Sequence, residues 1–261
     1  MEARLFRRVI KQCDYVTCLG PQHRDALVNL GIPWSKIRIV PNICEYEGVD
    51  EASVNAKHDS EEPVVRVLML SSLIDTKGYP EYLEALEDMS IHTDIRIRAT
   101  LCGPLTITPY SERFTSIVSA RAWIDDKVKA INASNNIQVE WIEGARGKVK
   151  QVLFEQAQIF VLPSRYKVEA QPLAVIEAMS WGCAIVTSAV GELPSTVDET
   201  SAIILPSPDS VSVCHAVKQL CEDTSFRKNL GLGALRRFNQ KFSRNLYIKS
   251  WKDLLFRDTE N

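Results

Sequence analysis

From Val64 onward, short apolar runs alternate with longer segments of helical periodicity. The apolar runs lie at 64–71, 95–102, 137–142, 158–162, 183–187 and 202–205. Strands that alternate with helices are typical of a parallel sheet covered by helices on both faces. The run Ile159 to Leu162 has no polar residue, as expected of a strand buried on both sides. The sequence therefore predicts an α/β fold built on a Rossmann-like parallel sheet.

The remaining segments complete this outline. Between the strands we expect helices at 79–90, 111–133, 147–157 and 172–181, and after them at 209–222, 225–241 and 243–256. Asp209 and Ser243 are the predicted N-caps of two of the later helices. Before Val64 we expect helices at 1–12 and 21–30 and strands at 14–18 and 36–40. The polar, acidic stretch 46–62 is interpreted as a linker or mobile loop. The predicted division is a first piece over 1–45, the linker 46–62, a main domain over 63–241 and a C-terminal helix within 242–261.

Composition excludes several classes of function. The chain has 31 Lys and Arg against 33 Asp and Glu, a net charge of −2, so no broad attraction to nucleic acid or an anionic membrane is implied. The seven cysteines form no Cys-x-x-Cys pattern and indicate reduced, mostly buried thiols in a cytoplasmic protein. The four histidines are dispersed and Asp125-Asp126 is not an Asp-x-Asp motif, so no metal site is expected.

Polar and small residues follow several of the predicted strands. They are Ser71-Ser72, Cys102-Gly103-Pro104, Gly144, Pro163-Ser164 and Ser188 to Gly191. In a doubly wound sheet, ligands bind beyond the carboxyl ends of the strands. We therefore expect these residues to gather on one rim and to line a ligand cleft there.

Two carboxylates stand eight positions apart after the strand at 158–162. Glu169 lies in a loop, and Glu177 lies in a helix predicted to begin at Pro172, a residue favoured at the first helical position. Both carboxylates can face one cleft at the positive end of that helix. Carboxylates accept hydrogen bonds from hydroxyl groups and a helix N-terminus holds negative charge. This combination suits a polyhydroxylated, phosphate-bearing ligand.

The segment Glu169 to Glu177 resembles the E-x7-E signature of glycosyltransferase family 4, the retaining sugar-nucleotide enzymes of GT-B fold. Other parts of the chain resemble the same family in the same order: Lys36 to Asn42, Leu70 to Leu73 followed by Lys77-Gly78, Phe160 to Ser164, Gly191 and Phe242-Ser243. The resemblance implies that this chain corresponds to the C-terminal, donor-binding half of a GT-B enzyme. Residues 1–45 would then be the end of an N-terminal acceptor-binding half that is otherwise absent.

The resemblance also implies roles for individual residues. Glu169 and Lys77 would be catalytic, Glu169 contacting the donor sugar near the reacting carbon and Lys77 meeting the diphosphate. Glu177 would hold the nucleotide ribose. Further substrate-binding positions would be Ser72, Gly103, Gly144, Ala170, Gln171, Pro172 and Gly191. The basic residues Arg146, Lys148 and Lys150 lie near where the family seats the nucleotide base.

Two positions depart from the family pattern. Many members have an arginine five positions before the lysine, where this chain has Ser72, and the change removes one bidentate phosphate contact. Members often have Gly-Phe where this chain has Ala170-Gln171, which leaves the identity of the sugar open.

The expected function is transfer of a hexose-type sugar from a nucleoside-diphosphate sugar to an acceptor hydroxyl, with retention of configuration. The acceptor would be a glycan or a lipid-linked molecule, no cofactor or metal would be needed, and the protein would act in the cytoplasm, including peripherally at the inner membrane face. Three alternatives stay open: a non-catalytic donor-binding or scaffold subunit with a separate acceptor-domain partner, an inactive remnant, and a sugar-nucleotide epimerase of the same shape.

Overall fold

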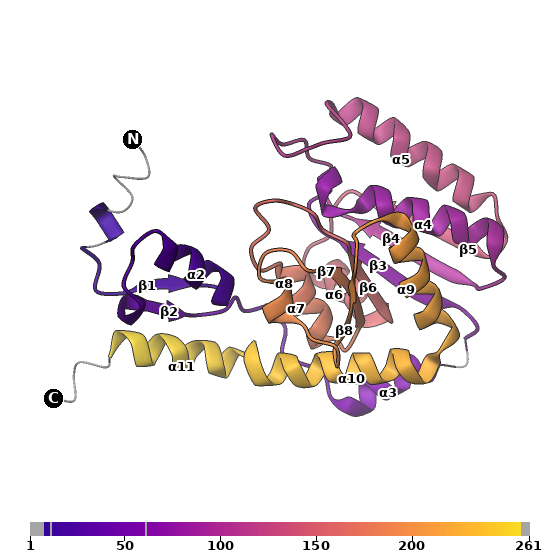
Figure 1. The fold of residues 1–261 in the computed structure, drawn as a ribbon. Coiled ribbons are helices and arrows are strands. Elements are labelled where there is room, and N and C mark those ends of the chain that lie inside the picture. Colours follow the sequence, from indigo (N-terminus) through magenta and orange to yellow (C-terminus); the bar gives the residue numbers. More distant parts are fainter. Residues whose placement is uncertain (1–7, 11, 61, 257–261) are drawn as a thin grey trace.

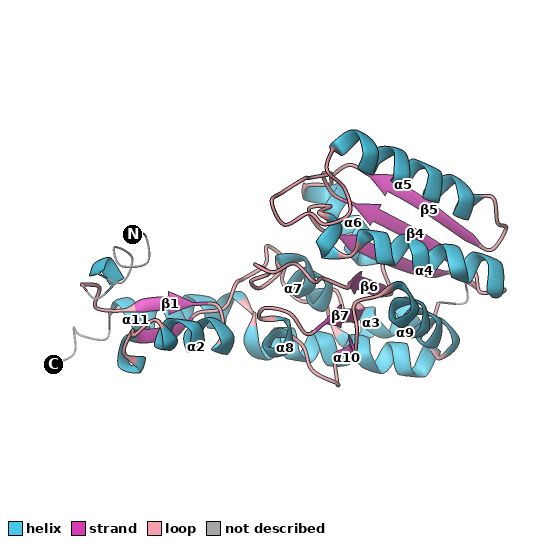
Figure 2. Ribbon diagram, turned by 45° about the horizontal axis from the view of Figure 1, so that its top comes forward, coloured by secondary structure: helices cyan, strands magenta, loops and turns pink. Residues whose placement is uncertain are grey.

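The computed structural model describes residues 8–10, 12–60 and 62–256, and its main body is one six-stranded parallel sheet (Figures 1 and 2). The strands are β3 (Val65–Leu70), β4 (Ile97–Cys102), β5 (Ile137–Ile142), β6 (Ile159–Leu162), β7 (Ala184–Ser188) and β8 (Ala202–Leu205). Their order across the sheet is β5-β4-β3-β6-β7-β8, and every neighbouring pair is parallel. The α/β fold with a Rossmann-like sheet is therefore confirmed.

The strand order reverses direction between β3 and β6. The chain moves outward from β3 to β5 on one side of the sheet, then returns and moves outward from β6 to β8 on the other. In sheets of this kind the loops on either side of the reversal diverge and leave a crevice at the carboxyl ends of the two central strands. The sheet topology alone therefore places a ligand crevice beyond Leu70 and Leu162.

Helices cover both faces of this sheet. They are α4 (Tyr79–His92), α5 (Ile117–Asn132), α6 (Gly147–Gln156), α7 (Leu173–Ser180), α8 (Leu193–Thr196), α9 (Ser210–Glu222) and α10 (Thr224–Lys241), with a 3₁₀ turn η2 (Asp75–Lys77) before α4. Helix α4 packs against α5 and α9, while α10 packs against α7. All residues of β6 and β7 are buried between these layers, as the unbroken apolar run at Ile159 to Leu162 predicts.

A small second unit precedes the main sheet. It contains β1 (Val16–Cys18), α2 (Pro21–Asn29), a 3₁₀ turn η1 (Trp34–Lys36) and β2 (Ile37–Ile39), and its two strands pair in parallel. Its own core consists of Cys18, Ile32 and Ile37. The last helix, α11 (Arg244–Leu255), continues from α10 and runs back to this unit (Figure 1). The helix predicted over 1–12 lies mostly outside the described residues. Within that range, the described residues 8–10 are helical.

The expectation for residues 46–62 was wrong in part, because this stretch contains a helix, α3 (Glu51–His58). The Asp50 side chain accepts a hydrogen bond from the Ser53 N–H and caps the helix. Only Val54 and His58 of α3 are buried, and the helix packs on α10. One valine in eight residues produces no apolar periodicity, so the packing that stabilises α3 leaves almost no trace in the sequence.

The helix predicted over 111–133 begins later, at Ile117. The buried carboxylate of Asp75 accepts hydrogen bonds from the backbone N–H groups of Glu112, Arg113 and Phe114, which holds this stretch in an irregular loop. Ser116 then caps α5 by accepting from the Ser119 N–H. A contact between positions nearly forty residues apart therefore decides where the helix begins.

Two predicted N-caps differ in outcome. The Asp209 side chain accepts from the Ser212 N–H, as expected, whereas Ser243 occupies the N-cap position of α11 without a side-chain capping bond.

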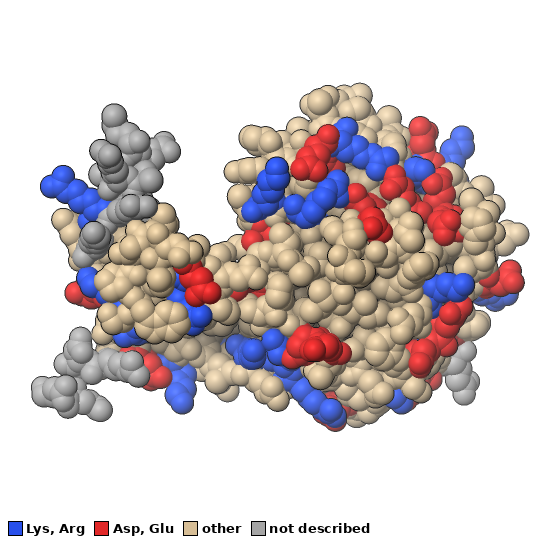
Figure 3. Space-filling model, viewed as in Figure 1, with Lys and Arg blue, Asp and Glu red and all other residues tan. Residues whose placement is uncertain are grey.

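All seven cysteines are free, and five of them are buried. No helix among the described residues has the length and apolar character that crossing a membrane requires. On the face shown in Figure 3, acidic and basic side chains are interspersed, and a notch lies between the small unit and the large one.

Candidate donor site

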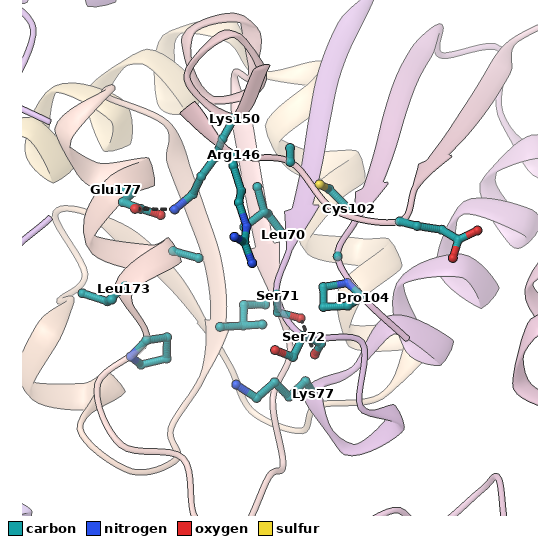
Figure 4. Close-up of a pocket in the computed structure, with 17 residues that line it drawn as sticks. Leu70, Ser71, Ser72, Lys77, Cys102, Pro104, Arg146, Lys150, Leu173 and Glu177 are labelled. Carbon is teal, nitrogen blue, oxygen red and sulfur yellow. Dashed lines mark hydrogen bonds and ion pairs between the residues drawn. The ribbon is translucent and has the colours of Figure 1, made fainter. Parts of the chain in front are cut away.

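A pocket of about 750 Å³ lies at the reversal point of the sheet. Its lining comes from the segments that follow β3, β4 and β5, from the end of β6 and from the start of α7 (Figure 4). Its size is in the range that holds a cofactor or drug-sized ligand. Six of the predicted site residues line it: Ser72, Lys77, Gly103, Gly144, Pro172 and Glu177. The expected ligand crevice at the carboxyl ends of the strands is thus present.

Four other predicted residues, Glu169, Ala170, Gln171 and Gly191, do not line this pocket. They lie beside it in a bonded network. The Glu192 N–H donates to the Ala170 carbonyl oxygen at 2.9 Å. Gln171 is buried and faces the small unit, where its side-chain oxygen accepts from the Asn42 N–H at 2.7 Å. Glu169, Ala170 and Gln171 thus belong to the segment that leads into α7, and Gly191 lies close against that segment.

Glu177 is the most constrained polar residue of the pocket. Its side chain is 2% exposed, and its Oε1 accepts from Lys150 Nζ at 2.6 Å. Its Oε2 is buried and has no hydrogen-bond partner among the described residues. Burial raises the pKa of the carboxyl, and the Lys150 ammonium partly offsets the rise. A buried acceptor without a partner costs free energy unless a ligand or water hydrogen supplies the bond, so this oxygen is prepared to accept one.

Lys77 connects the pocket to the first carboxylate. Its Nζ lies 3.4 Å from Glu169 Oε1 and 5.3 Å from the centre of the Tyr166 ring. The other Glu169 oxygen accepts from Ser164 Oγ at 2.8 Å, and the residue is 7% exposed. The ammonium of Lys77 is therefore held at one end of the pocket, while the Lys150–Glu177 pair is at the other (Figure 4).

Two glycines allow the segments of the site to approach one another closely. Gly103 has φ +147°, and a Cβ there would lie 1.7 Å from the Ser71 carbonyl oxygen. Gly191 has φ +53°, and a Cβ there would lie 2.0 Å from the Glu169 carbonyl oxygen. Because only glycine adopts such backbone angles readily and has no Cβ, these positions cannot take another residue without movement of the site.

The start of α7 differs by one residue from the expectation. Pro172 is the N-cap, with φ −63° and ψ 119°, and the first helical residue is Leu173. No side chain caps α7, and Pro172, Leu173 and Ala174 all line the pocket. The first turn of a helix has unsatisfied N–H groups and a partial positive charge, so this end of α7 favours a negatively charged ligand group.

Reasoning from the sequence missed the pairing of Lys150 with Glu177. The two residues are 27 positions apart on different helices, α6 and α7, so no local pattern in the sequence relates them. It also grouped Lys148 with Arg146 and Lys150, but Lys148 does not line the pocket. The helical spacing offered a signal, because positions 146 and 150 are four apart and share a helix face whereas 148 does not.

Among the described residues, no group of three His, Cys, Asp or Glu is placed to hold a metal ion.

The fold is shared with several solved structures. The Anabaena protein Alr3699/HepE, crystallised in complex with UDP and glucose, superimposes with a TM-score of 0.70 at 12% identity over 99% of this chain and 67% of that chain. Sucrose-phosphate synthase from Thermosynechococcus elongatus gives 0.71 at 20% identity over 98% and 61%. A glycosyltransferase from Rickettsia africae gives 0.70 at 15% identity over 98% and 67%. The chain thus spans roughly two thirds or less of the length of these GT-B proteins.

Comparison of the sequence itself gives a consistent result. No curated protein matches the chain. The family model described as "Glycosyl transferases group 1" matches residues 50–237, which is well over half of the chain and includes every residue that lines the pocket. This chain therefore belongs to the family of group 1 glycosyl transferases.

Proposed function

We propose that this chain binds a nucleoside-diphosphate sugar in the pocket and is the donor-binding part of a retaining glycosyltransferase of family 4. The observation that carries the proposal is the Glu177 carboxylate, whose Oε1 is held by Lys150 and whose buried Oε2 has no partner. A ribose hydroxyl would donate to Oε2. UDP in the solved structure of Alr3699/HepE supports the choice of a nucleotide as ligand.

The geometry suggests how the rest of a donor would lie. The uncapped start of α7 and the Lys77 ammonium would meet the diphosphate, which carries the negative charge. Glu169 lies beyond Lys77 and would contact a hexose-type sugar. In transfer, the bond from the anomeric carbon to the phosphate oxygen breaks, and the acceptor oxygen bonds to the same face of that carbon. The acceptor proton passes to the leaving diphosphate, whose charge Lys77 stabilises. The proposal requires no metal or cofactor.

The acceptor and the place of action belong to the same proposal. We propose an acceptor hydroxyl on a glycan or a lipid-linked molecule, and action in the cytoplasm or at the inner membrane face, which the seven free thiols support. Every lining residue of the pocket lies between Leu70 and Glu177, so donor binding needs no side chain from residues 1–45. The observation favours a second candidate function, a donor-binding subunit that transfers sugar only with a separate acceptor-binding partner.

Isothermal titration of the whole chain with UDP, GDP and ADP tests the proposal. We expect one nucleotide to bind, and Glu177→Gln to weaken it by about 1–3 kcal/mol because a charge-assisted hydrogen bond is lost. Glu199→Gln is the matched control, since Glu199 is exposed and lies outside this pocket. If none of the three nucleotides binds, the proposed donor site is wrong. Binding without transfer from the corresponding sugar nucleotide would identify the donor-binding subunit.

A further inference from the structure

The charged groups of the pocket are not balanced. Three cationic side chains line it: Lys77, Arg146 and Lys150. Lys77 is paired with Glu169 and Lys150 with Glu177. The remaining acidic residue of the lining, Glu143, is bound by both terminal nitrogens of Arg121 at 2.7 and 2.6 Å. The Arg146 side chain makes no ion pair or hydrogen bond with any described residue, so its charge is the one that the protein leaves unmatched in this pocket.

Arg146 also points into the pocket. Its side chain extends over Leu70 and Ser71, and its guanidinium lies between the Lys150–Glu177 pair and the end that holds Ser72 and Lys77 (Figure 4). The residue is the N-cap of α6, yet its side chain makes no capping bond with that helix. Its backbone is extended, with φ −137° and ψ 161°. The side chain is therefore free to carry its five N–H donors toward a ligand.

The short side chain of Ser72 leaves room in the pocket for this guanidinium. Ser72 follows β3 and its hydroxyl is short, whereas Arg146 follows β5, two strands away. The guanidinium lies between the Glu177 end of the pocket, where the proposed function puts the ribose, and the Lys77 end, where it puts the diphosphate. A planar guanidinium binds two phosphate oxygens at once, which an ammonium does not.

We propose that Arg146 is a diphosphate ligand of the donor nucleotide, supplying from the loop between β5 and α6 the guanidinium that the β3 side of the pocket lacks at Ser72. This inference rests on the proposed function and adds to it a specificity-determining residue. If Arg146 binds the diphosphate, the chain should bind a nucleoside diphosphate more tightly than the matching nucleoside, and loss of Arg146 should reduce that difference.

The test compares nucleotides that differ only in phosphate. The whole chain and its Arg146→Gln and Arg146→Lys variants are titrated with whichever of UDP, GDP and ADP binds. The matching nucleoside is measured by ligand-observed NMR. We expect Arg146→Gln to weaken the diphosphate by about tenfold or more, and Arg146→Lys to weaken it less, while the nucleoside binds all three proteins alike. Lys148→Gln removes a nearby exposed charge outside the pocket and should change affinity by no more than about twofold.

A second variant makes the assignment more specific. If Arg146 replaces a guanidinium from the β3 side, Ser72→Arg should restore diphosphate affinity in the Arg146→Gln background. Equal loss of nucleoside and diphosphate affinity would place Arg146 at the base or ribose and overturn the proposal. Unchanged diphosphate affinity in Arg146→Gln would overturn it as well, with nucleotide binding by the unaltered chain left intact. Absence of all nucleotide binding by the unaltered chain would instead remove the proposed function, and this inference with it.

Discussion

Among the buried ionisable residues of this chain, some line the pocket and others lie outside it. Glu177 belongs to the first, where a cation already holds one carboxylate oxygen and a ligand can take the other. His58 belongs to the second. Its Nε2 donates to the Gly182 carbonyl oxygen at 3.0 Å, and its Nδ1 has no partner among the described residues. His58 does not line the pocket, so we expect it to affect stability rather than ligand binding.

His58 makes stability depend on pH. Burial, with Lys57 and Arg227 nearby, lowers the pKa of His58 from its ordinary 6.5 to about 4. Between these values the unfolded chain binds a proton that the folded chain does not, so the unfolding free energy falls as the pH drops from about 6.5 to about 4. The fall should be on the order of 3 kcal/mol. Urea denaturation at several pH values measures it. His58→Gln should flatten the curve relative to the exposed control His215→Gln, and parallel curves for the two variants would contradict the assignment.

Most elements of the main sheet follow from the sequence because their signals are local. The apolar runs at 137–142 and 202–205 are strands with those bounds, and the others differ by one or two residues at one or both ends. The misjudged segments share a different cause. Helix α3 is stabilised by contacts with α10, and the loop at 111–116 is held by the carboxylate of Asp75. Both depend on partners distant in sequence, which periodicity cannot reveal.

The candidate site divides in the same way. Ser72, Gly103 and Gly144 follow strands of a parallel sheet, so the rim on which they lie follows from the topology. Glu169 is in an irregular segment, where the direction of a side chain depends on distant partners, here Lys77 and Ser164. Because the segment is neither helix nor strand, its sequence has no hydrophobic periodicity from which the direction of the Glu169 side chain could be predicted. Spacing could therefore place Glu177 by helical geometry but could not place Glu169.

Helix α10 contains Gly233, whose replacement by alanine should destabilise the chain although helix propensity alone predicts stabilisation. Alanine in place of glycine within a helix ordinarily stabilises by about 1 kcal/mol. At Gly233, however, a Cβ would lie 1.8 Å from the Thr200 carbonyl oxygen. We expect Gly233→Ala to destabilise the chain by about 1–3 kcal/mol, because backbone must move to accept the methyl group.

Urea denaturation measures this effect against Asn229→Ala, a substitution at an exposed position of the same helix. The control should be neutral or slightly stabilising. If Gly233→Ala raises the unfolding free energy as propensity alone predicts, the close approach of α10 to the 198–201 segment is wrong.

At the scale of the whole molecule, the two units differ in how much core they have. The helices and the main sheet share one continuous cluster of buried side chains, whereas the buried cluster of the small unit, among the residues described, consists of Cys18, Ile32 and Ile37. Its strands β1 and β2 have three residues each, and α2 buries none of its side chains. A two-stranded sheet with so little apolar support is marginally stable by itself.

Hydrogen exchange measured by mass spectrometry should resolve this difference. We expect the amides of β1 and β2 to exchange by local opening, well before those of β3, β6 and β7, which should exchange only when the main domain opens globally. The 15–40 peptides and the 159–188 peptides of one sample provide an internal comparison. Equal protection in both regions would mean that the small unit unfolds together with the main sheet.

The chain passes between the two units twice, once after β2 and once where α10 gives way to α11. A body attached to another at two points can turn only about the line that joins them. We expect rotation about this line to widen or narrow the notch seen in Figure 3. Two hydrogen bonds join the small unit to the large one on this side: the Asn42 N–H donates to Gln171, in the segment that carries Glu169, and the His23 N–H donates to Glu192, whose own N–H donates to the Ala170 carbonyl oxygen. We therefore expect rotation of the small unit to displace Gln171 and the segment that also carries Glu169, so that a motion away from the pocket is transmitted to this carboxylate.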